Sequence, residues 1–311
     1  MGFFTAFPPK IYPVGDRLLP DGPGFSLQTA GTLAWAAQAA YETSDRDKLQ
    51  TILTGWNWTL VDVFDQPAPG GWPLAGAKGF VATSGDATIV AVAGTEPENF
   101  EDWFQNFDAI PAENGAHSGF QAGAEAVQAE LDRLRAAGRG IYLTGHSLGG
   151  AIAALTASML ETAQAGRVAC VHTIGMPRPG NAKYATAYNA ALGNKTFRLV
   201  HGADLVTKVG PARMGYRHVG SVLSCPHLGT FDVAQLVPPP EIVDPGEIWA
   251  IAAAAAAAIG IGPRNDAPRY PAIEPGAQDA AALLPNQIRD HLPDCYLRAL
   301  NALPDVPPAR P

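Results

Sequence analysis

Segments with helical and with strand periodicity alternate through the middle of the chain. Apolar residues at helical spacing predict helices over residues 27–43, 45–54, 118–137, 181–192 and 286–302. Short β-prone runs predict strands over 58–64, 77–83, 87–93, 141–144, 168–174 and 196–200, and an antiparallel strand or hairpin over 215–225. Strands that alternate with helices are typical of a layered α/β fold with a mainly parallel central sheet.

The most informative motif is a G-x-S-x-G sequence at residues 145–149, which follows the run 141–144 and precedes an Ala-rich helical segment. Strand, sharp turn and helix is the context of a nucleophile elbow. Such a turn strains the backbone of Ser147, and Gly145 and Gly149 remove Cβ atoms that would clash there. The helix start directs its N–H groups and positive dipole end to the space above Ser147. The motif therefore predicts Ser147 as a nucleophile; the alternative is a Gly-rich loop that happens to contain Ser.

An amphipathic segment follows the run 87–93. Its aromatic residues share one helix face, and its other face is acidic. The aromatic residues are Phe100, Trp103, Phe104 and Phe107. This pattern fits either an ordinary surface helix or a lid that shows aromatic surface to a substrate.

Composition limits the class of protein. The chain has 311 residues, which favours one large domain (1–311, core about 27–302), and 47% hydrophobic residues suffice for a sizeable core. A net charge of −8 without a basic cluster disfavours a nucleic-acid partner. Three Cys are too few for a disulfide framework: Cys170 is expected to be buried, and the redox state of Cys225 and Cys295 is open. No metal-ligand spacing is present, so no metal or cofactor is expected.

Neither the first residues of the chain nor the apolar stretch 249–261 predicts a targeting signal or a membrane anchor. The first 15 residues lack a basic region, and Pro8 and Pro9 interrupt the apolar run, so they do not form a signal peptide. The apolar stretch 249–261 is too short to span a bilayer and is expected to be an Ala-rich helix. The chain is thus expected either to be cytoplasmic or to have lost a leader, with no transmembrane anchor. The Pro- and Ala-rich segment 238–275 is expected to be an insertion, cap or loop region.

An ordered set of motifs resembles the class 3 lipases, the α/β-hydrolase family of the filamentous-fungal triacylglycerol lipases and their bacterial relatives. The set consists of Ala93-Gly-Thr95, the Trp103 segment, His117-Ser-Gly-Phe120, the elbow, Gly175-Met-Pro-Arg-Pro-Gly-Asn181 and Val200-His-Gly-Ala-Asp204. The resemblance covers about residues 75–220 well and the region of His291 loosely. It implies an α/β-hydrolase fold.

The resemblance also implies a Ser-Asp-His triad in the order that this fold uses. The nucleophile would be Ser147, the acid Asp204 and the base His291, which lies 87 residues after Asp204, a longer gap than is usual in the family. The oxyanion hole would be formed by the N–H groups of Leu148 and Thr95.

Other residues compete for these roles. His227 is the second candidate for the base, His218 is also permitted by chain order, and Asp232 and Asp244 are rivals of Asp204. His146, His172 and His201 are expected to be structural, and His117 matches a family position that is not the base. Asp290 is expected to be a poor partner for His291, because neighbouring residues on a helix do not face each other.

The resemblance implies a serine hydrolase acting on lipid esters at a lipid–water interface, as a triacylglycerol lipase does. A short-chain esterase, a feruloyl esterase and a phospholipase A1 use the same triad and stay open as alternatives. A catalytically silent α/β-hydrolase that only binds ligands is a further alternative from another class. The oligomeric state is not predicted.

Overall fold

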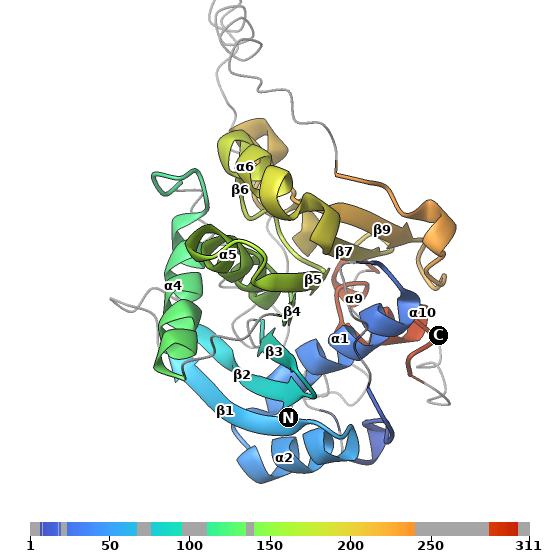
Figure 1. Ribbon diagram of the computed structural model, residues 1–311. Coiled ribbons are helices and arrows are strands. Elements are labelled where there is room, and N and C mark those ends of the chain that lie inside the picture. Colours follow the sequence, from blue (N-terminus) through green and yellow to red (C-terminus); the bar gives the residue numbers. More distant parts are fainter. Residues whose placement is uncertain are drawn as a thin grey trace, which may run out of the picture.

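A seven-stranded sheet with the order β1-β2-β3-β4-β5-β7-β9 forms the centre of the protein (Figure 1). The computed structural model describes residues 7, 9–17, 19, 24–66, 76–94, 111–134, 140–239 and 286–303. The strands are β1 (Thr59–Gln66), β2 (Ala77–Ser84), β3 (Ala87–Val92), β4 (Ile141–His146), β5 (Val168–Ile174), β7 (Thr196–His201) and β9 (Ser221–Cys225). The sheet is antiparallel from β1 to β3 and parallel from β3 to β9, as expected for an α/β-hydrolase fold.

Helices cover both faces of this sheet. They are α1 (Leu27–Ala39), α2 (Arg46–Gly55), α4 (Ser118–Arg133), α5 (Leu148–Ala163), α6 (Ala182–Leu192), α9 (Asn286–Arg289) and α10 (Pro293–Ala299). Figure 1 shows α1 and α10 side by side on one face and α4 and α5 on the other. Neighbouring parallel strands are joined by crossover connections, and the helices in these connections cover the faces of the sheet.

The core consists of two apolar clusters, one on each face of the sheet. One cluster joins α1 and α10 to the sheet through side chains such as Trp35, Ile89 and Leu297, and the other joins α4 and α5 to it through Phe120, Leu143 and others. Strand β4 has every residue buried, because it is covered from both sides. The G-x-S-x-G motif therefore lies at the end of a strand that is buried throughout.

Helix caps occur where polar residues precede the predicted helices. Ser26, Asp45 and Asn181 each accept a hydrogen bond from the N–H three residues later, at the starts of α1, α2 and α6. Such caps satisfy N–H groups that have no partner within the helix. The predicted helices over 27–43, 45–54, 118–137 and 181–192 are confirmed to within a few residues.

The prediction of an antiparallel strand or hairpin over residues 215–225 was right for the first part of the segment and wrong for the second. Strand β9 pairs in parallel with β7 and extends the main sheet. The preceding residues form β8 (Tyr216–Arg217), which pairs antiparallel with β6 (Gly180–Asn181) in a separate two-stranded sheet. Gly220, whose φ is +71°, separates the two segments and allows the chain to turn between them.

The predicted helix over 286–302 was also wrong, since it is broken into α9 and α10. Pro293 begins α10, and Leu292 before it is extended, with φ −66° and ψ 140°. A residue before proline avoids the helical conformation, because it would clash with the proline ring. The break places His291 in the connection between two short helices instead of on a continuous helix.

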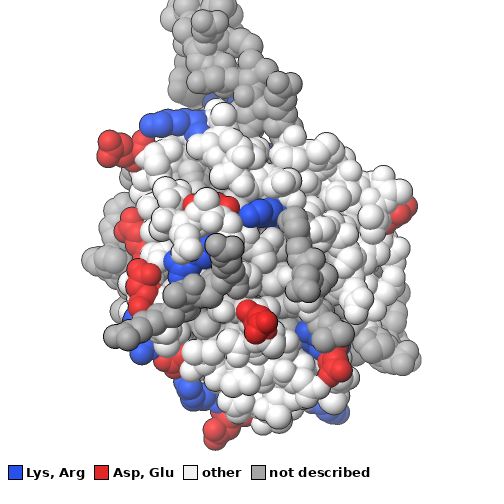
Figure 2. All heavy atoms as spheres, viewed as in Figure 1, with Lys and Arg blue, Asp and Glu red and all other residues white. Residues whose placement is uncertain are grey.

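The three cysteines are free thiols, and Cys170 is buried as predicted. Among the described residues, no helix is both long and apolar enough to cross a membrane. The expected aromatic lid helix, Thr95 and the segment 238–275 except for its first two residues lie outside the described residues. Charged side chains are scattered over a mostly uncharged surface in Figure 2, consistent with the 16% charged residues of the sequence.

Candidate active site

Ser147 lies at the sharp turn between β4 and α5, as the elbow motif predicts. Its φ of 57° and ψ of −130° place it in a strained region that residues with a side chain rarely adopt. The turn is stabilised by a 2.8 Å hydrogen bond from the Ser147 N–H to the carbonyl of Ile174. The Ser147 side chain is buried, and its Oγ makes no hydrogen bond to any described residue.

Glycines are required around this turn for steric reasons. A Cβ on Gly145 would lie 2.3 Å from the carbonyl carbon of Gly149, and a Cβ on Gly149 would lie 2.3 Å from the carbonyl oxygen of Val92. A Cβ on Gly94, at the end of β3, would lie 2.9 Å from the Cβ of Ser147. The backbone therefore approaches itself too closely at these positions for any residue other than glycine.

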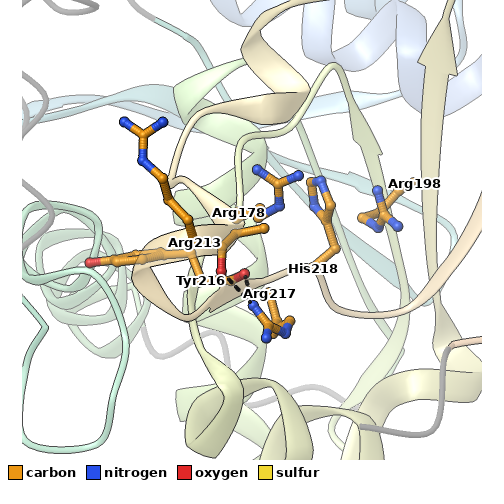
Figure 3. Close-up of a pocket in the computed structure, with 7 residues that line it drawn as sticks. Arg178, Arg198, Arg213, Tyr216, Arg217 and His218 are labelled. Atoms are coloured by element: carbon orange, nitrogen blue, oxygen red, sulfur yellow. Dashed lines mark hydrogen bonds between the residues drawn. The ribbon is translucent and has the colours of Figure 1, made fainter. Parts of the chain in front are cut away.

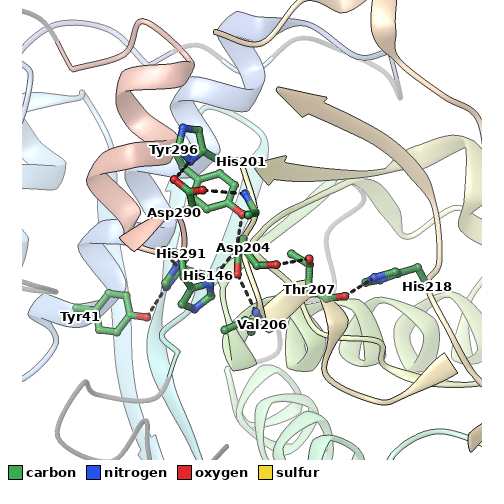
Figure 4. Close-up of polar contacts among 11 residues, drawn as sticks. Tyr41, His146, His201, Asp204, Val206, Thr207, His218, Asp290, His291 and Tyr296 are labelled. Carbon is green, nitrogen blue, oxygen red and sulfur yellow. Dashed lines mark hydrogen bonds and ion pairs between the residues drawn. The ribbon is translucent and has the colours of Figure 1, made fainter. Parts of the chain in front are cut away.

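Asp204 and His291 form a buried pair, although 87 residues separate them. His291 Nδ1 donates to Asp204 Oδ2 at 2.9 Å, and both side chains are almost completely buried (Figure 4). A carboxylate can only accept, so Nδ1 carries the proton and Nε2 is the basic nitrogen of the neutral ring. This is the relation of acid to base in a serine hydrolase triad.

Two further donors hold the Asp204 carboxylate. The Val206 N–H donates to Oδ1 at 2.8 Å, and the Tyr296 hydroxyl donates to Oδ2 at 2.5 Å. Burial and the charge of Asp204 raise the pKa of Tyr296 well above 10, so this hydroxyl stays protonated and remains a donor. No sequence pattern singled out Tyr296, which lies 92 residues from Asp204.

All three triad candidates pack around the end of β5. Ser147 bonds to Ile174, and the next residue, Gly175, has φ +62°. A Cβ on Gly175 would lie 2.8 Å from Asp204 Oδ2 and 2.9 Å from His291 Cε1. The arrangement brings the three candidates together at the C-terminal end of β5. Ser147 Oγ makes no hydrogen bond to His291 Nε2. Such catalytic hydrogen bonds often form only when substrate binds.

His146 holds the backbone of the base, a role that the sequence did not predict. Its Nε2 lies 2.7 Å from the His291 carbonyl oxygen, and its Nδ1 lies 2.8 Å from the Tyr41 hydroxyl. Since a carbonyl only accepts, Nε2 donates and Nδ1 accepts from Tyr41. Burial, together with the nearby His291, lowers the pKa of His146 well below 6.5, so the ring stays neutral in this arrangement. The expectation of a structural role was right, but the side chain contacts the site.

Asp290 forms a second buried Asp–His cluster beside the pair. Its Oδ2 accepts from the Ala203 N–H at 2.8 Å, and its Oδ1 lies 2.5 Å from His227 Nδ1 and 3.3 Å from His201 Nδ1. Asp290 thus faces away from His291, as predicted. Its bond to Ala203 fastens the chain beside His291 to the loop beside Asp204.

The remaining histidines are not placed to act as the base. His227, the second candidate, binds Asp290 and not Asp204. His218 donates from Nε2 to the Thr207 carbonyl at 2.8 Å. His172 is fully buried, and burial lowers its pKa to about 3. His117 caps α4, where its ring accepts from the Phe120 N–H.

Of the two expected oxyanion-hole donors, Leu148 belongs to the described residues and Thr95 does not. Leu148 is the first residue of α5, and the first N–H groups of a helix have no acceptor within it. The other expected donor, Thr95, lies outside the described residues, as do Phe100, Trp103, Phe104 and Phe107. Gly94, directly before Thr95, lies against Ser147. No three His, Cys, Asp or Glu side chains of the described residues are arranged to hold a metal ion.

The fold and the elbow define a protein of the α/β-hydrolase class. Residues 82–214 match the sequence model of the family Lipase (class 3). This part of the chain is therefore similar to the class 3 lipases, in agreement with the resemblance of the ordered motifs.

Curated and solved proteins of similar sequence or fold agree with this assignment. The secreted mono- and diacylglycerol lipase 1 of Fusarium solani is 31% identical over 155 residues, which is 46% of each chain. A secreted mono- and diacylglycerol lipase of Malassezia restricta is 37% identical over 78 residues, 25% of this chain and 26% of its own. The chain thus spans less than half the length of these curated relatives. The solved triacylglyceride lipase of Rhizomucor miehei has a TM-score of 0.52 at 19% identity, covering 68% of this chain and 82% of its own, which supports the shared fold.

Proposed function

We propose that the protein is a serine carboxylic-ester hydrolase that acts on lipid esters through an acyl-enzyme intermediate. The observation that carries the proposal is the buried hydrogen bond of 2.9 Å between His291 Nδ1 and Asp204 Oδ2, beside a strained Ser147 on a nucleophile elbow. The family match and the names of the curated relatives, which are mono- and diacylglycerol lipases, support a lipid ester as the substrate.

In the proposed reaction, Ser147 Oγ attacks the ester carbonyl carbon while His291 Nε2 takes the Oγ proton. Asp204 holds the ring through Nδ1 and stabilises the imidazolium that forms. His291 then gives the proton to the leaving alcohol, which departs and leaves an acyl-Ser147 ester. Water next attacks this ester as His291 removes one of its protons; the bond between the acyl carbon and Ser147 Oγ then breaks as His291 returns that proton to Oγ, and the acid is released.

The N–H groups of Leu148 and Thr95 would bind the oxyanion of each tetrahedral intermediate. Loss of one such donor commonly lowers kcat about a hundred- to a thousand-fold. In this proposal Phe100, Trp103, Phe104 and Phe107 form a lid or a wall of the acyl pocket. If they do, Trp103→Ala lowers turnover of long-chain esters and its dependence on an interface, while short soluble esters are hydrolysed as before.

The deciding experiment is a chain-length series of p-nitrophenyl esters and of emulsified mono-, di- and triacylglycerols. Ser147→Ala is expected to lower kcat at least about a thousand-fold on every substrate. Ser224→Ala, at an exposed position of β9, is the matched control and should keep full activity.

The substrate profile separates the alternatives. Ser147-dependent turnover of long-chain emulsified acylglycerols supports a lipase. Activity confined to short soluble esters identifies an esterase, and selective turnover of feruloyl esters or phospholipids identifies a feruloyl esterase or a phospholipase A1. If turnover persists unchanged in Ser147→Ala, the proposed nucleophile is wrong; if neither the wild type nor Ser147→Ala turns over any ester, the hydrolase proposal is wrong and a binding protein is the better description.

A further inference from the structure

A cavity lies beside β8 and is lined by none of the triad candidates. Its volume is about 570 Å³. Its lining is dominated by cationic and polar side chains, namely Arg178, Arg198, Arg213, Tyr216, Arg217 and His218. Figure 3 shows the guanidinium of Arg178 and the side chain of Arg198 on either side of the His218 ring. Such a concentration of positive charge is unexpected in a chain with a net charge of −8.

Within the described part of the chain, none of these four arginines forms an ion pair with a carboxylate. Arg178 donates to the carbonyls of Lys208 and Gly210, at 2.6 and 3.0 Å, and Arg217 donates to that of Ala212 at 3.0 Å. Elsewhere in the protein, Arg46 bonds to Asp62 in the ordinary way. The cavity therefore has positive charge that no side chain of the described residues neutralises.

Among the four arginines, Arg198 is the clearest case of a positive charge that no described carboxylate neutralises. Its side chain is only 6% exposed, and of its guanidinium nitrogens only Nε makes a hydrogen bond to a described residue, to the Val219 carbonyl at 2.9 Å. Burial and the neighbouring Arg178 lower the pKa of Arg198 to about 9. Burying a cation without a counter-charge costs free energy, so an anion that binds in the cavity would stabilise the folded protein.

His218 contributes a buried polar atom without a partner in the described residues. Its Nε2 donates to the Thr207 carbonyl, and its Nδ1 makes no hydrogen bond to any described residue. Burial and the charges of Arg198 and Arg178 lower the pKa of His218 well below 6.5. The neutral ring therefore presents an acceptor nitrogen beside the guanidinium groups, which suits an anion that carries an O–H group of its own.

We propose that this cavity binds a phosphate group, either inorganic phosphate or a phosphomonoester such as the head group of an anionic phospholipid. The planar fork of a guanidinium matches the oxygens of a phosphate in pairs, and several such forks line one cavity here. Inorganic phosphate keeps at least one O–H group near neutral pH, and a phosphomonoester keeps one in its monoanionic form, below its second pKa of about 6; the His218 acceptor can receive such an O–H group. This site is separate from ester hydrolysis and does not depend on it.

The test measures binding of sodium phosphate against sodium chloride at equal ionic strength. A ligand that binds only the folded protein raises the Tm of this 311-residue chain by about 2 °C at ten times its Kd. The double variant Arg213→Gln/Arg217→Gln should lose most of this rise and weaken Kd, measured by calorimetry, at least about tenfold. The double variant Lys10→Gln/Arg46→Gln removes the same charge outside the cavity and should respond like the wild type.

The single variant Arg213→Gln, at an exposed residue, serves if the double variant does not fold. Equal Tm rises in the cavity and control variants, or no rise in the wild type, would overturn the proposal.

Flotation with phosphatidylcholine vesicles, with and without phosphatidic acid, separates the two sources of phosphate. Vesicle binding that needs phosphatidic acid, is lost in Arg213→Gln/Arg217→Gln and is competed by free phosphate assigns the site to a lipid head group. Phosphate binding without vesicle binding assigns it to a soluble phosphate or phosphomonoester. None of these measurements uses ester turnover, so the phosphate site and the proposed hydrolase function can fail independently.

Discussion

Replacing Tyr296 by Phe deletes one hydroxyl from the proposed active site and leaves the ring in place. The hydroxyl is the third donor to the Asp204 carboxylate, after the Val206 N–H and His291. The ring packs against Phe231 and is fully buried, and a Phe ring of the same shape can keep these contacts. The variant therefore measures what the hydrogen bond contributes and not the loss of packing.

The magnitude follows from the charge of the acceptor. A hydrogen bond to a charged group contributes about 1.5–3 kcal/mol to stability. With an unfolding entropy of about 2.1 cal/mol/K per residue, each kcal/mol lowers the Tm of this 311-residue chain by about 1.5 °C, so Tm should fall by about 2–5 °C. The carboxylate is then held at one fewer point while the imidazolium forms. If about 1.4 kcal/mol of the loss falls on the transition state, kcat decreases about tenfold with KM unchanged.

The assay is a kcat and KM measurement on p-nitrophenyl esters together with thermal unfolding. Tyr188→Phe is the matched control, because its buried hydroxyl pairs with Thr196 Oγ1 at 2.8 Å, away from the triad. A neutral hydrogen bond contributes about 0.5–1.5 kcal/mol, so this control should lower Tm modestly and leave kcat unchanged. The reasoning is refuted if Tyr296→Phe keeps wild-type kcat, or if Tyr188→Phe loses as much kcat as Tyr296→Phe.

Three further predictions concern pH, steric fit and docking. Burial lowers the pKa of His172 from 6.5 to about 3, so this residue makes the folded state less stable as pH falls below about 6.5, by up to about 1.4 kcal/mol per pH unit. His172→Phe should therefore reduce the difference in the free energy of unfolding between pH 5 and pH 7, measured with urea. An unchanged difference would contradict the lowered pKa of His172. Gly149→Ala should abolish folding, measured as soluble yield and circular dichroism, whereas Gly55→Ala, with open space around its Cβ, should fold normally; a folded, active Gly149→Ala would disprove the steric argument. Asp290→Asn should lower both Tm and kcat, because Asp290 binds the Ala203 N–H next to Asp204, and a fall in Tm with full kcat would limit its role to stability.

Local pattern was enough to predict most of the elements and the elbow. The β-prone runs 77–83 and 87–93 predicted the strands β2 and β3, and the apolar run 168–174 predicted β5 to the residue. The elbow is local as well, because its steric demands fall on glycines within two residues of Ser147 and on the neighbouring strand. The sequence order and the family motifs also pointed to Asp204 and His291, which the structure joins by a hydrogen bond.

What the sequence could not predict depends on contacts between distant segments. Tyr41 and His146 are 105 residues apart, and His146 and the carbonyl of His291 are 145 apart, so no local pattern links them. The parallel pairing of β9 was missed because an antiparallel hairpin and a parallel edge strand have the same alternation of residues. The break before Pro293 is local, and its proline was the signal that could have placed it.

The docking of α9 and α10 has a consequence for the making of the protein. The segment with His291 reaches its place through the Asp290 bond to Ala203, the His146 bond to the His291 carbonyl and the packing of α10 against α1. Every strand of the central sheet precedes that segment in the chain. During synthesis, the proposed nucleophile and acid therefore leave the ribosome well before the proposed base. A nascent or truncated chain that holds the whole sheet would still lack the group that activates Ser147, so the proposed activity arises only after the last described helices have been made and docked.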